Sequence, residues 1–264
     1  MSLGGHLREL RKRILIAALG VLGGTIFGWW ASDLVFVGLQ APIAAVAEQS
    51  GRGAALNFDT IAGSFDLRMQ IAITIGIVVS SPLWLYEIWA FLTPGLMKKE
   101  RAFGIGFICS AVPLFLAGCA VGWMVMPHLV ELFVSFAPAD SISNISARYY
   151  YDFVLKLMIA TGVGFVLPVI LVLLNFAGVV SGRAIIRGWR WAILVIVTFT
   201  AATTPVTDIV SMFLLAVPML VLYFAAAGVA LLNDRRRRRR EAAFLAQEGV
   251  DAPADLTDLG DAIA

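Results

Sequence analysis

Charged residues are scarce in this chain. Aspartate, glutamate, lysine and arginine make up 14% of its 264 residues, against about 25% in soluble domains. Hydrophobic residues make up 60%, and the mean hydropathy is +0.87. This composition excludes an ordinary soluble domain and predicts a protein that crosses a membrane several times.

Histidine and cysteine are also rare, with two of each. His6 and His128 fall on opposite sides of the predicted membrane, which excludes a serine–histidine pair or a two-histidine metal site within one chain. Cys109 and Cys119 lie on one predicted helix, about 15 Å apart and beyond disulfide reach, so we expect packing thiols. The sequence therefore predicts no enzyme, no metal and no cofactor, and no nucleic-acid partner.

Long apolar runs, in contrast, fill most of the chain. They predict an all-α integral membrane protein with six transmembrane helices, at about 14–37, 67–91, 103–126, 149–176, 191–202 and 209–232. Pro82 should kink the second span, and Pro127 should close the third. The uncharged part of the fifth span has 12 residues. It is about 18 Å long against a hydrocarbon core of about 30 Å, and a tight outer turn joins it to span six.

Positive charge is distributed unevenly along these spans. If the amino terminus is inside, 16 of the 20 lysines and arginines fall on the cytoplasmic side, and the other four are Arg52, Arg68, Arg148 and Lys156. This bias predicts that both termini are cytoplasmic. We expect residues 1–233 to form one membrane domain and residues 234–264 to form a basic, then acidic, disordered cytoplasmic tail. The arginine run 235–240 is expected to contact anionic lipid.

Two dense motifs stand near the predicted cytoplasmic surface. Residues 6–13 read HLRELRKR, and residues 81–101 read SPLWLYEIWAFLTPGLMKKER. By physical chemistry alone, the first is a basic helix start in which Glu9 pairs with Arg13 at i+4. The second is a kinked helix end with interfacial aromatic residues, a Pro-Gly turn and a basic loop.

In their order, these motifs resemble the TatC family, the multispanning receptor subunit of the twin-arginine protein translocase. The resemblance covers roughly residues 3–232 and includes Pro42 after span one, Pro168 in span four and the turn that ends at Asp208. It implies a cupped six-helix bundle in the bacterial plasma (inner) membrane. The bundle would bind signal peptides with two consecutive arginines at its cytoplasmic face. The implied partners are single-span TatA/TatB-type subunits and further copies of the chain, in a complex that exports folded cargo proteins by means of the proton gradient.

The resemblance also gives the acidic residues a role. It implies that Glu9 and Glu100 form the twin-arginine site, since a carboxylate accepts two parallel hydrogen bonds from a planar guanidinium group. The residues that would shape the same surface are Arg11, Phe91, Pro94 and Lys98. Phe91 has the alternative role of an ordinary interfacial aromatic residue.

Three further positions are functional by resemblance. They are Pro42, Glu87 and Asp208. Glu87 is interpreted first as a structural residue whose polar side chain holds neighbouring helices together near the helix end. Asp208 is expected to cap the sixth helix, although its turn reads TPVTD where many relatives have the shorter TPPD.

Span four departs from the family pattern, because Val166 stands where many relatives have glutamate or glutamine. A partner helix would then dock differently, for example through span-five threonines: Thr198, Thr200, Thr203 and Thr204. The alternative function is a proton- or ion-coupled small-solute transporter, which needs paired charges near the midplane. Only Glu87 comes close, and the sequence shows no partner for it. An intramembrane hydrolase is a weaker alternative, because a paired base is lacking.

Overall fold

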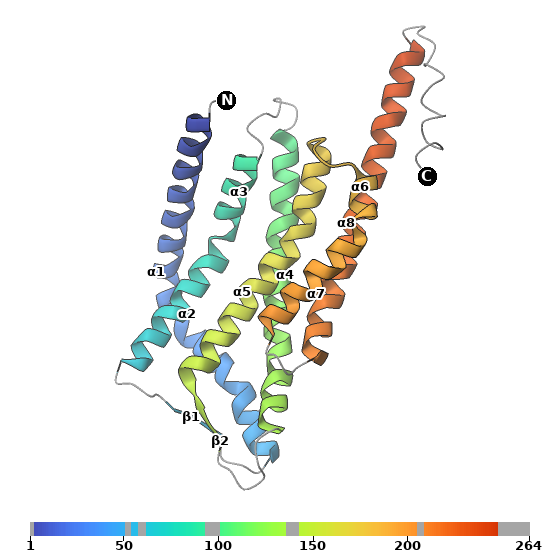
Figure 1. Ribbon diagram of the computed structural model, residues 1–264. Coiled ribbons are helices and arrows are strands. Elements are labelled where there is room, and N and C mark those ends of the chain that lie inside the picture. Colours follow the sequence, from blue (N-terminus) through green and yellow to red (C-terminus); the bar gives the residue numbers. More distant parts are fainter. Residues whose placement is uncertain are drawn as a thin grey trace.

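The computed structural model describes residues 3–50, 54–57, 62–92, 101–135, 143–204 and 209–247. These residues form helices side by side, with a small two-stranded sheet at one end (Figure 1). The helices are α1 (Leu3–Ser50), α2 (Gly63–Val79), α3 (Ser81–Leu92), α4 (Arg101–Ser135), α5 (Ala147–Phe176), α6 (Gly182–Arg187), α7 (Trp189–Thr203) and α8 (Ile209–Gln247). The strands are β1 (Ala54–Asn57) and β2 (Ser143–Ser146).

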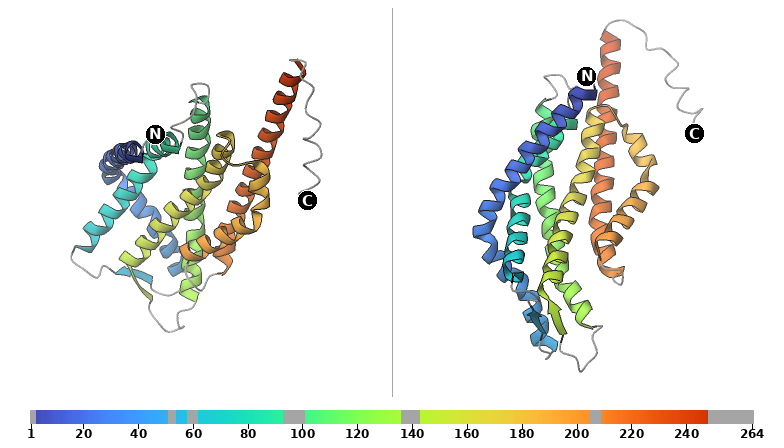
Figure 2. Two further views of the ribbon diagram at one scale, coloured as in Figure 1. Left: turned by 45° about the horizontal axis from the view of Figure 1, so that its top comes forward. Right: turned by 60° about the vertical axis from the view of Figure 1, so that its left-hand side comes forward.

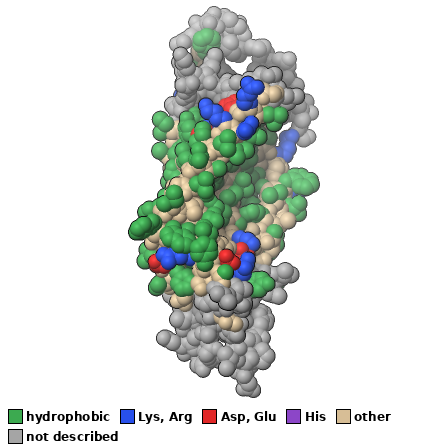
Figure 3. All heavy atoms as spheres, turned by 90° about the vertical axis from the view of Figure 1, so that its left-hand side faces the viewer, with side chains coloured by type: hydrophobic (Ala, Val, Ile, Leu, Met, Phe, Trp, Pro, Cys, Tyr) green, Lys and Arg blue, Asp and Glu red, His purple; other side chains and the backbone are tan. Residues whose placement is uncertain are grey.

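Several of these helices are suited to a bilayer. Four of them, α1, α4, α5 and α8, are long and apolar enough to cross a membrane, and α2 and α3 qualify together as a bent pair. Helix α7 has 15 apolar-rich residues and is about 22 Å long, so its predicted shortness is confirmed. Figure 3 shows a broad hydrophobic band between two charged regions. The chain is a multi-pass membrane protein.

The bend between α2 and α3 confirms the predicted kink. The two helices meet at Ser80 at an angle of 56°. Pro82 has no N–H to continue the α2 hydrogen-bond ladder. At the break, the indole Nε1 of Trp84 donates to the Ile77 carbonyl over 2.9 Å. This side-chain bond satisfies a carbonyl group at the end of α2.

Some helices continue past the predicted ends. The sequence predicts that Pro127 closes span three, but α4 continues through it to Ser135. The prediction was wrong because a proline removes one backbone donor without preventing helix on both sides of it. Similarly, α1 passes the predicted end of span one and reaches Ser50.

The largest extension is at the end of α8. The sequence predicts disorder from residue 234, whereas α8 continues through the arginine run to Gln247 (Figure 1). Arginine, glutamate, alanine, leucine and glutamine are all good helix formers. Because the membrane span has already nucleated the helix, each further residue adds at low cost.

The small sheet is the one departure from an all-helical fold among the described residues. Strands β1 and β2 pair in parallel, with Ala54 opposite Ser143 and Asn57 opposite Ser146. Each strand has four residues, too few for a clear alternating pattern, so the sequence analysis predicted neither strand. The pairing joins the region after α1 to the start of α5.

Small residues allow two helix pairs to pack closely. A Cβ at Gly76 of α2 would lie 2.5 Å from Thr25 Oγ1 of α1, and one at Gly118 of α4 would lie 2.7 Å from the Thr161 carbonyl of α5. Such approaches are typical of packed membrane helices. Deeper in the bundle, Val166 is buried in a cluster with Leu85 and Phe115. The position without the family's usual polar group is therefore part of the apolar core.

The two ends of the bundle differ in charge. At one end lie the start of α1, the end of α3, the start of α4, α6 and the far part of α8 (Figures 1 and 2). We call it the basic end, after Arg8, Arg11, Lys12, Arg13, Arg183, Arg187, Arg190 and Arg235–Arg240. The other, the strand end, holds β1 and β2. Its described cations each pair with a carboxylate: Arg68 with Asp33 at 3.0 Å, Arg148 with Asp66 at 3.5 Å and Lys156 with Asp152 at 2.6 Å.

Candidate functional site

At the basic end, one arginine lies between two carboxylates. Arg13 Nη2 is 2.7 Å from Glu9 Oε1, and Arg13 Nη1 is 3.0 Å from Glu87 Oε2. Arg13 Nε also donates to Glu9 Oε1 over 3.2 Å. The Glu87 side chain is only 10% exposed, whereas those of Arg13 and Glu9 are 23% and 27% exposed. We call this group the Glu9–Arg13–Glu87 cluster.

Two helices build the cluster. Glu9 and Arg13 are one turn apart on α1, a spacing that lets the side chains meet. Glu87 lies on α3, one turn before Phe91, which is in the last turn of that helix. The cluster therefore fixes the start of α1 to the end of α3.

The cluster has more acidic than basic groups. With both carboxylates ionised, the three groups carry a net charge of about −1. Charge-assisted hydrogen bonds favour the pairing of guanidinium groups with carboxylates, and Arg13 makes such bonds to both Glu9 and Glu87. Among the described residues, no group of three or more histidine, cysteine, aspartate or glutamate side chains could hold a metal ion.

Aromatic rings continue the surface beyond the cluster. The His6 ring stacks on the Phe91 ring, with centroids 4.5 Å apart and planes 24° apart. His6 is one turn before Glu9 on α1, and Phe91 is one turn after Glu87 on α3. The aromatic pair therefore lies one turn closer to the helix ends than the Glu9–Arg13–Glu87 cluster.

The other predicted site residues divide into two sets. Arg11 is exposed and, two residues from Glu9, lies on a different face of α1. The remaining residues fall outside the described part: Pro94, Lys98, Glu100 and Asp208 entirely, and the side chain of Pro42 within α1. Segment 93–100 nevertheless connects the end of α3 to the start of α4, and both lie at the basic end (Figure 1).

The sequence analysis missed the link between Arg13 and Glu87. It gave Glu87 no partner, which was wrong, and it left Arg13 out of the site. The two residues are 74 positions apart, so only the fold brings them together. The sole sequence signal was the i+4 spacing of Glu9 and Arg13.

The threonine hydroxyls near the end of α7 make hydrogen bonds within their own helix. The hydroxyls of Thr200, Thr203 and Thr204 donate to carbonyls of α7 itself, over 3.0, 3.0 and 2.8 Å. Thr200 and Thr204 are also buried. In the chain by itself these three hydroxyls are therefore satisfied within their own helix, because a hydroxyl readily bonds to the carbonyl one turn earlier. The role of the span-five threonines in docking a partner helix stays a prediction.

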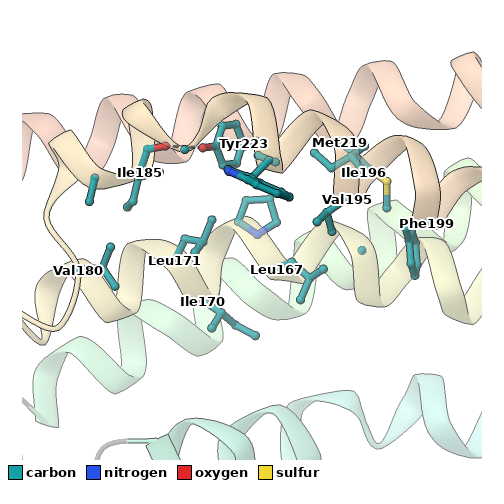
Figure 4. Close-up of a pocket in the computed structure, with 16 residues that line it drawn as sticks. Leu167, Ile170, Leu171, Val180, Ile185, Val195, Ile196, Phe199, Met219 and Tyr223 are labelled. Atoms are coloured by element: carbon teal, nitrogen blue, oxygen red, sulfur yellow. Dashed lines mark hydrogen bonds between the residues drawn. The ribbon is translucent and has the colours of Figure 1, made fainter.

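An apolar groove lies beside them, between α5, α7 and α8 (Figure 4). Its volume is about 510 Å³, and its walls include Leu167, Leu171, Val195, Phe199, Met219 and Tyr223. The Tyr223 hydroxyl donates to the Ile185 carbonyl at one end of the groove (Figure 4). The groove is therefore suited to an apolar occupant.

Comparisons with known proteins agree with one another. The family described as Sec-independent protein translocase protein (TatC) matches residues 5–218. The chain is 44% identical to the TatC protein of Xylanimonas cellulosilytica over 224 residues, 85% of this chain and 81% of the relative. It is 38% identical to the chloroplastic TATC protein of Pisum sativum over 84% of this chain and 62% of that protein.

A solved structure extends the similarity to the fold. The crystal structure of the twin arginine translocase receptor TatC in DDM superposes with a TM-score of 0.73 at 27% identity, covering 85% of this chain and 99% of that one. The resemblance that the two motifs suggested is thereby confirmed. The chain belongs to the TatC family, whose members are components of a protein translocase and not enzymes.

Proposed function

We propose that this chain is the core receptor subunit of a twin-arginine translocase. It binds twin-arginine signal peptides at the cytoplasmic face of the bacterial plasma membrane. It also serves as the scaffold on which single-span TatA/TatB-type subunits and further copies of the chain assemble for export of folded proteins, driven by the proton gradient.

The observation that carries this proposal is the Glu9–Arg13–Glu87 cluster. It places two carboxylates around one guanidinium group, with a negative charge left over, at the end of the bundle where the aromatic pair His6–Phe91 also lies. Arginines of a signal peptide would replace or join Arg13 at these carboxylates. The apolar stretch of the peptide would then pack near Phe91.

Glu100 belongs to this proposal by resemblance. It would enter from segment 93–100, which begins directly after α3, and would provide a further acceptor for the second arginine. Arg11, Pro94 and Lys98 would shape the surrounding surface. Glu87, which the sequence analysis interpreted first as a structural polar contact, becomes part of the recognition surface. Pro42 and Asp208 stay as functional positions by resemblance.

We also propose six spans in a cupped bundle with both termini cytoplasmic. The four long helices and the bent α2–α3 pair account for five of these crossings. The short apolar helix α7 would be the sixth. The positive-inside rule supports a cytoplasmic location for the basic end. Local bilayer thinning beside α7 would match its length of about 22 Å.

The apolar groove is the proposed contact for a single-span partner. Its lining is almost wholly apolar. Thr200, Thr203 and the following Thr204 donate to carbonyls of α7, so packing would dominate this contact. The transporter alternative needs paired charges near the midplane. Glu87 does have a charged partner, Arg13, but the pair joins the early turns of α1 to the last turns of α3 at the basic end of the bundle.

The testing experiment is binding of a twin-arginine signal peptide to the purified protein in nanodiscs, beside a twin-lysine peptide. We expect the twin-lysine peptide to bind at least about tenfold more weakly, because lysine cannot make the paired hydrogen bonds of arginine. Glu9→Gln and Glu87→Gln should each weaken twin-arginine binding by a similar factor, since each removes a charged acceptor.

Asp66→Asn is the matched control. It removes one exposed carboxylate at the strand end and should leave peptide affinity unchanged. Equal binding of both peptides, by the intact protein and by the variants, would contradict the proposal. Uptake of a small solute into proteoliposomes would then favour the transporter.

A further inference from the structure

A second charged site lies at the basic end, away from the Glu9–Arg13–Glu87 cluster. A hollow of about 580 Å³ opens between α6, the start of α7 and α8, lined by Arg183, Ile186, Arg187, Trp189, Arg190 and Leu231. All three arginines are exposed. Within the described part of the chain, none of them is in an ion pair with a carboxylate.

Helix α6 is held firmly in place as one wall of this hollow. Asp234 of α8 accepts from the Gly182 backbone N–H over 2.7 Å and from Asn175 Nδ2 over 2.8 Å. Tyr223 of α8 donates to the Ile185 carbonyl. These bonds also satisfy Asp234, the acid that directly precedes the arginine run. The arginines are therefore presented from a fixed support.

Positive charge converges on the hollow from two helices. Arg183 and Arg187 are one turn apart on α6, and Arg190 lies over the Trp189 ring, 5.6 Å from its centroid. On α8, Arg235 and Arg238 follow Leu231 at i+4 and i+7, so they continue the same helix face. A ligand here would be anionic.

The apolar residues that line the hollow indicate whether the anion is a lipid headgroup or a soluble phosphate. Ile186, Trp189 and Leu231 form its apolar lining, and tryptophan is typical of the level of lipid headgroups. Leu194 of α7 and Leu232 of α8, which are close in sequence to Arg190 and Leu231, have side chains that are each 56% exposed. Exposed apolar side chains of this kind can contact acyl chains. A soluble phosphate would gain nothing from these residues.

We infer that this hollow binds the headgroup of an anionic phospholipid from the leaflet at the basic end. The arginines contact the phosphate group, and Trp189 and the apolar residues contact the upper acyl chains. The site is distinct from the apolar groove, because Ala184 and Ile185 line the groove while Arg183 and Arg187 line the hollow. It does not depend on signal-peptide binding.

The test is a lipid titration of the purified full chain, followed by native mass spectrometry. Phosphatidylglycerol should bind more tightly than phosphatidylcholine. The variant Arg183→Gln/Arg187→Gln should lose about 30-fold in phosphatidylglycerol affinity, the sum expected for two arginines at an anionic surface. Arg183→Lys/Arg187→Lys keeps the charge and should stay within about threefold of the natural chain.

Arg236→Gln/Arg240→Gln is the matched control. It removes the same charge from the opposite face of α8 and should change affinity less than about threefold, because solvent and salt screen distant charges. Equal loss in the two glutamine variants would overturn the site in favour of diffuse attraction. Equal binding of both lipids, or full displacement of lipid by an equimolar concentration of glycerol phosphate, would also overturn it.

Discussion

Among single residues, Arg13 has the most demanding environment at the basic end. It forms ion pairs with two carboxylates, and one of them, Glu87, is nearly buried. If the guanidinium group were removed, two anions would face each other with little water around Glu87. A carboxylate that loses its partner in such a place costs more than an exposed ion pair contributes.

We therefore predict that Arg13→Gln lowers stability by about 1–3 kcal/mol. The double variant Arg13→Gln/Glu87→Gln should be less destabilised than the sum of the two single variants, because it leaves no unpaired anion on α3. Thermal unfolding in nanodiscs measures both effects. Arg8→Gln, which removes an exposed cation of α1, is the control. Strict additivity would mean that Arg13 and Glu87 are not coupled.

The sequence was informative about one half of this cluster. The i+4 spacing of Glu9 and Arg13 predicts their pairing from local geometry alone. The third member could not be predicted, since the position of α3 beside α1 depends on packing along both helices. For the same reason, the burial of Val166 in an apolar cluster emerged only from the fold.

At the scale of elements, close contact between α1 and α2 depends on glycine. A side chain at Gly76 would meet the Thr25 backbone N at 2.7 Å and the Val21 carbonyl at 2.9 Å. Both are backbone atoms of α1, so a rotamer change cannot relieve the contact. The helices would have to separate.

We predict that Gly76→Ala destabilises the protein by about 1–3 kcal/mol through this overpacking. At Gly106 of α4, an added Cβ would meet nothing within 4 Å, so Gly106→Ala should be neutral or stabilising by up to about 1 kcal/mol. Thermal unfolding of the two variants in the same nanodiscs gives the comparison. A stable Gly76→Ala protein would show that α1 and α2 can shift apart without loss.

The apolar runs predicted where the apolar helices lie, and Pro82 predicted the bend, because both effects are local in the chain. Helix ends were less predictable. Pro127 did not stop α4, and the arginine run did not stop α8. Strands β1 and β2 stabilise each other only as a pair, and a four-residue segment carries too little pattern to reveal its partner.

At the scale of the whole molecule, charge is the strongest asymmetry. The described cations of the strand end are each neutralised by a carboxylate, whereas those of the basic end greatly outnumber the acids there. Moving a net positive segment across a membrane is costly. The paired cations lower that cost at the strand end, which fits the proposed orientation.

Cysteine labelling tests this orientation directly. In a Cys109→Ser/Cys119→Ser background, we predict that a membrane-impermeant maleimide labels Asn57→Cys in intact bacterial cells and does not label Arg240→Cys. Both positions are exposed, so both should react once the membrane is permeabilised. Labelling of Arg240→Cys alone in intact cells would show that the orientation is reversed.

The extension of α8 has a mechanical consequence. From Asp234 to Gln247 the helix continues for about 20 Å, without an interruption at the membrane surface. Such a rod acts as a lever arm whose base is fastened to Asn175 and Gly182. A tilt of span six by about 10° would swing the tip by about 3.5 Å at that length. A change in the tilt of α8 would therefore move its far end more than it moves the part of the helix at Asp234.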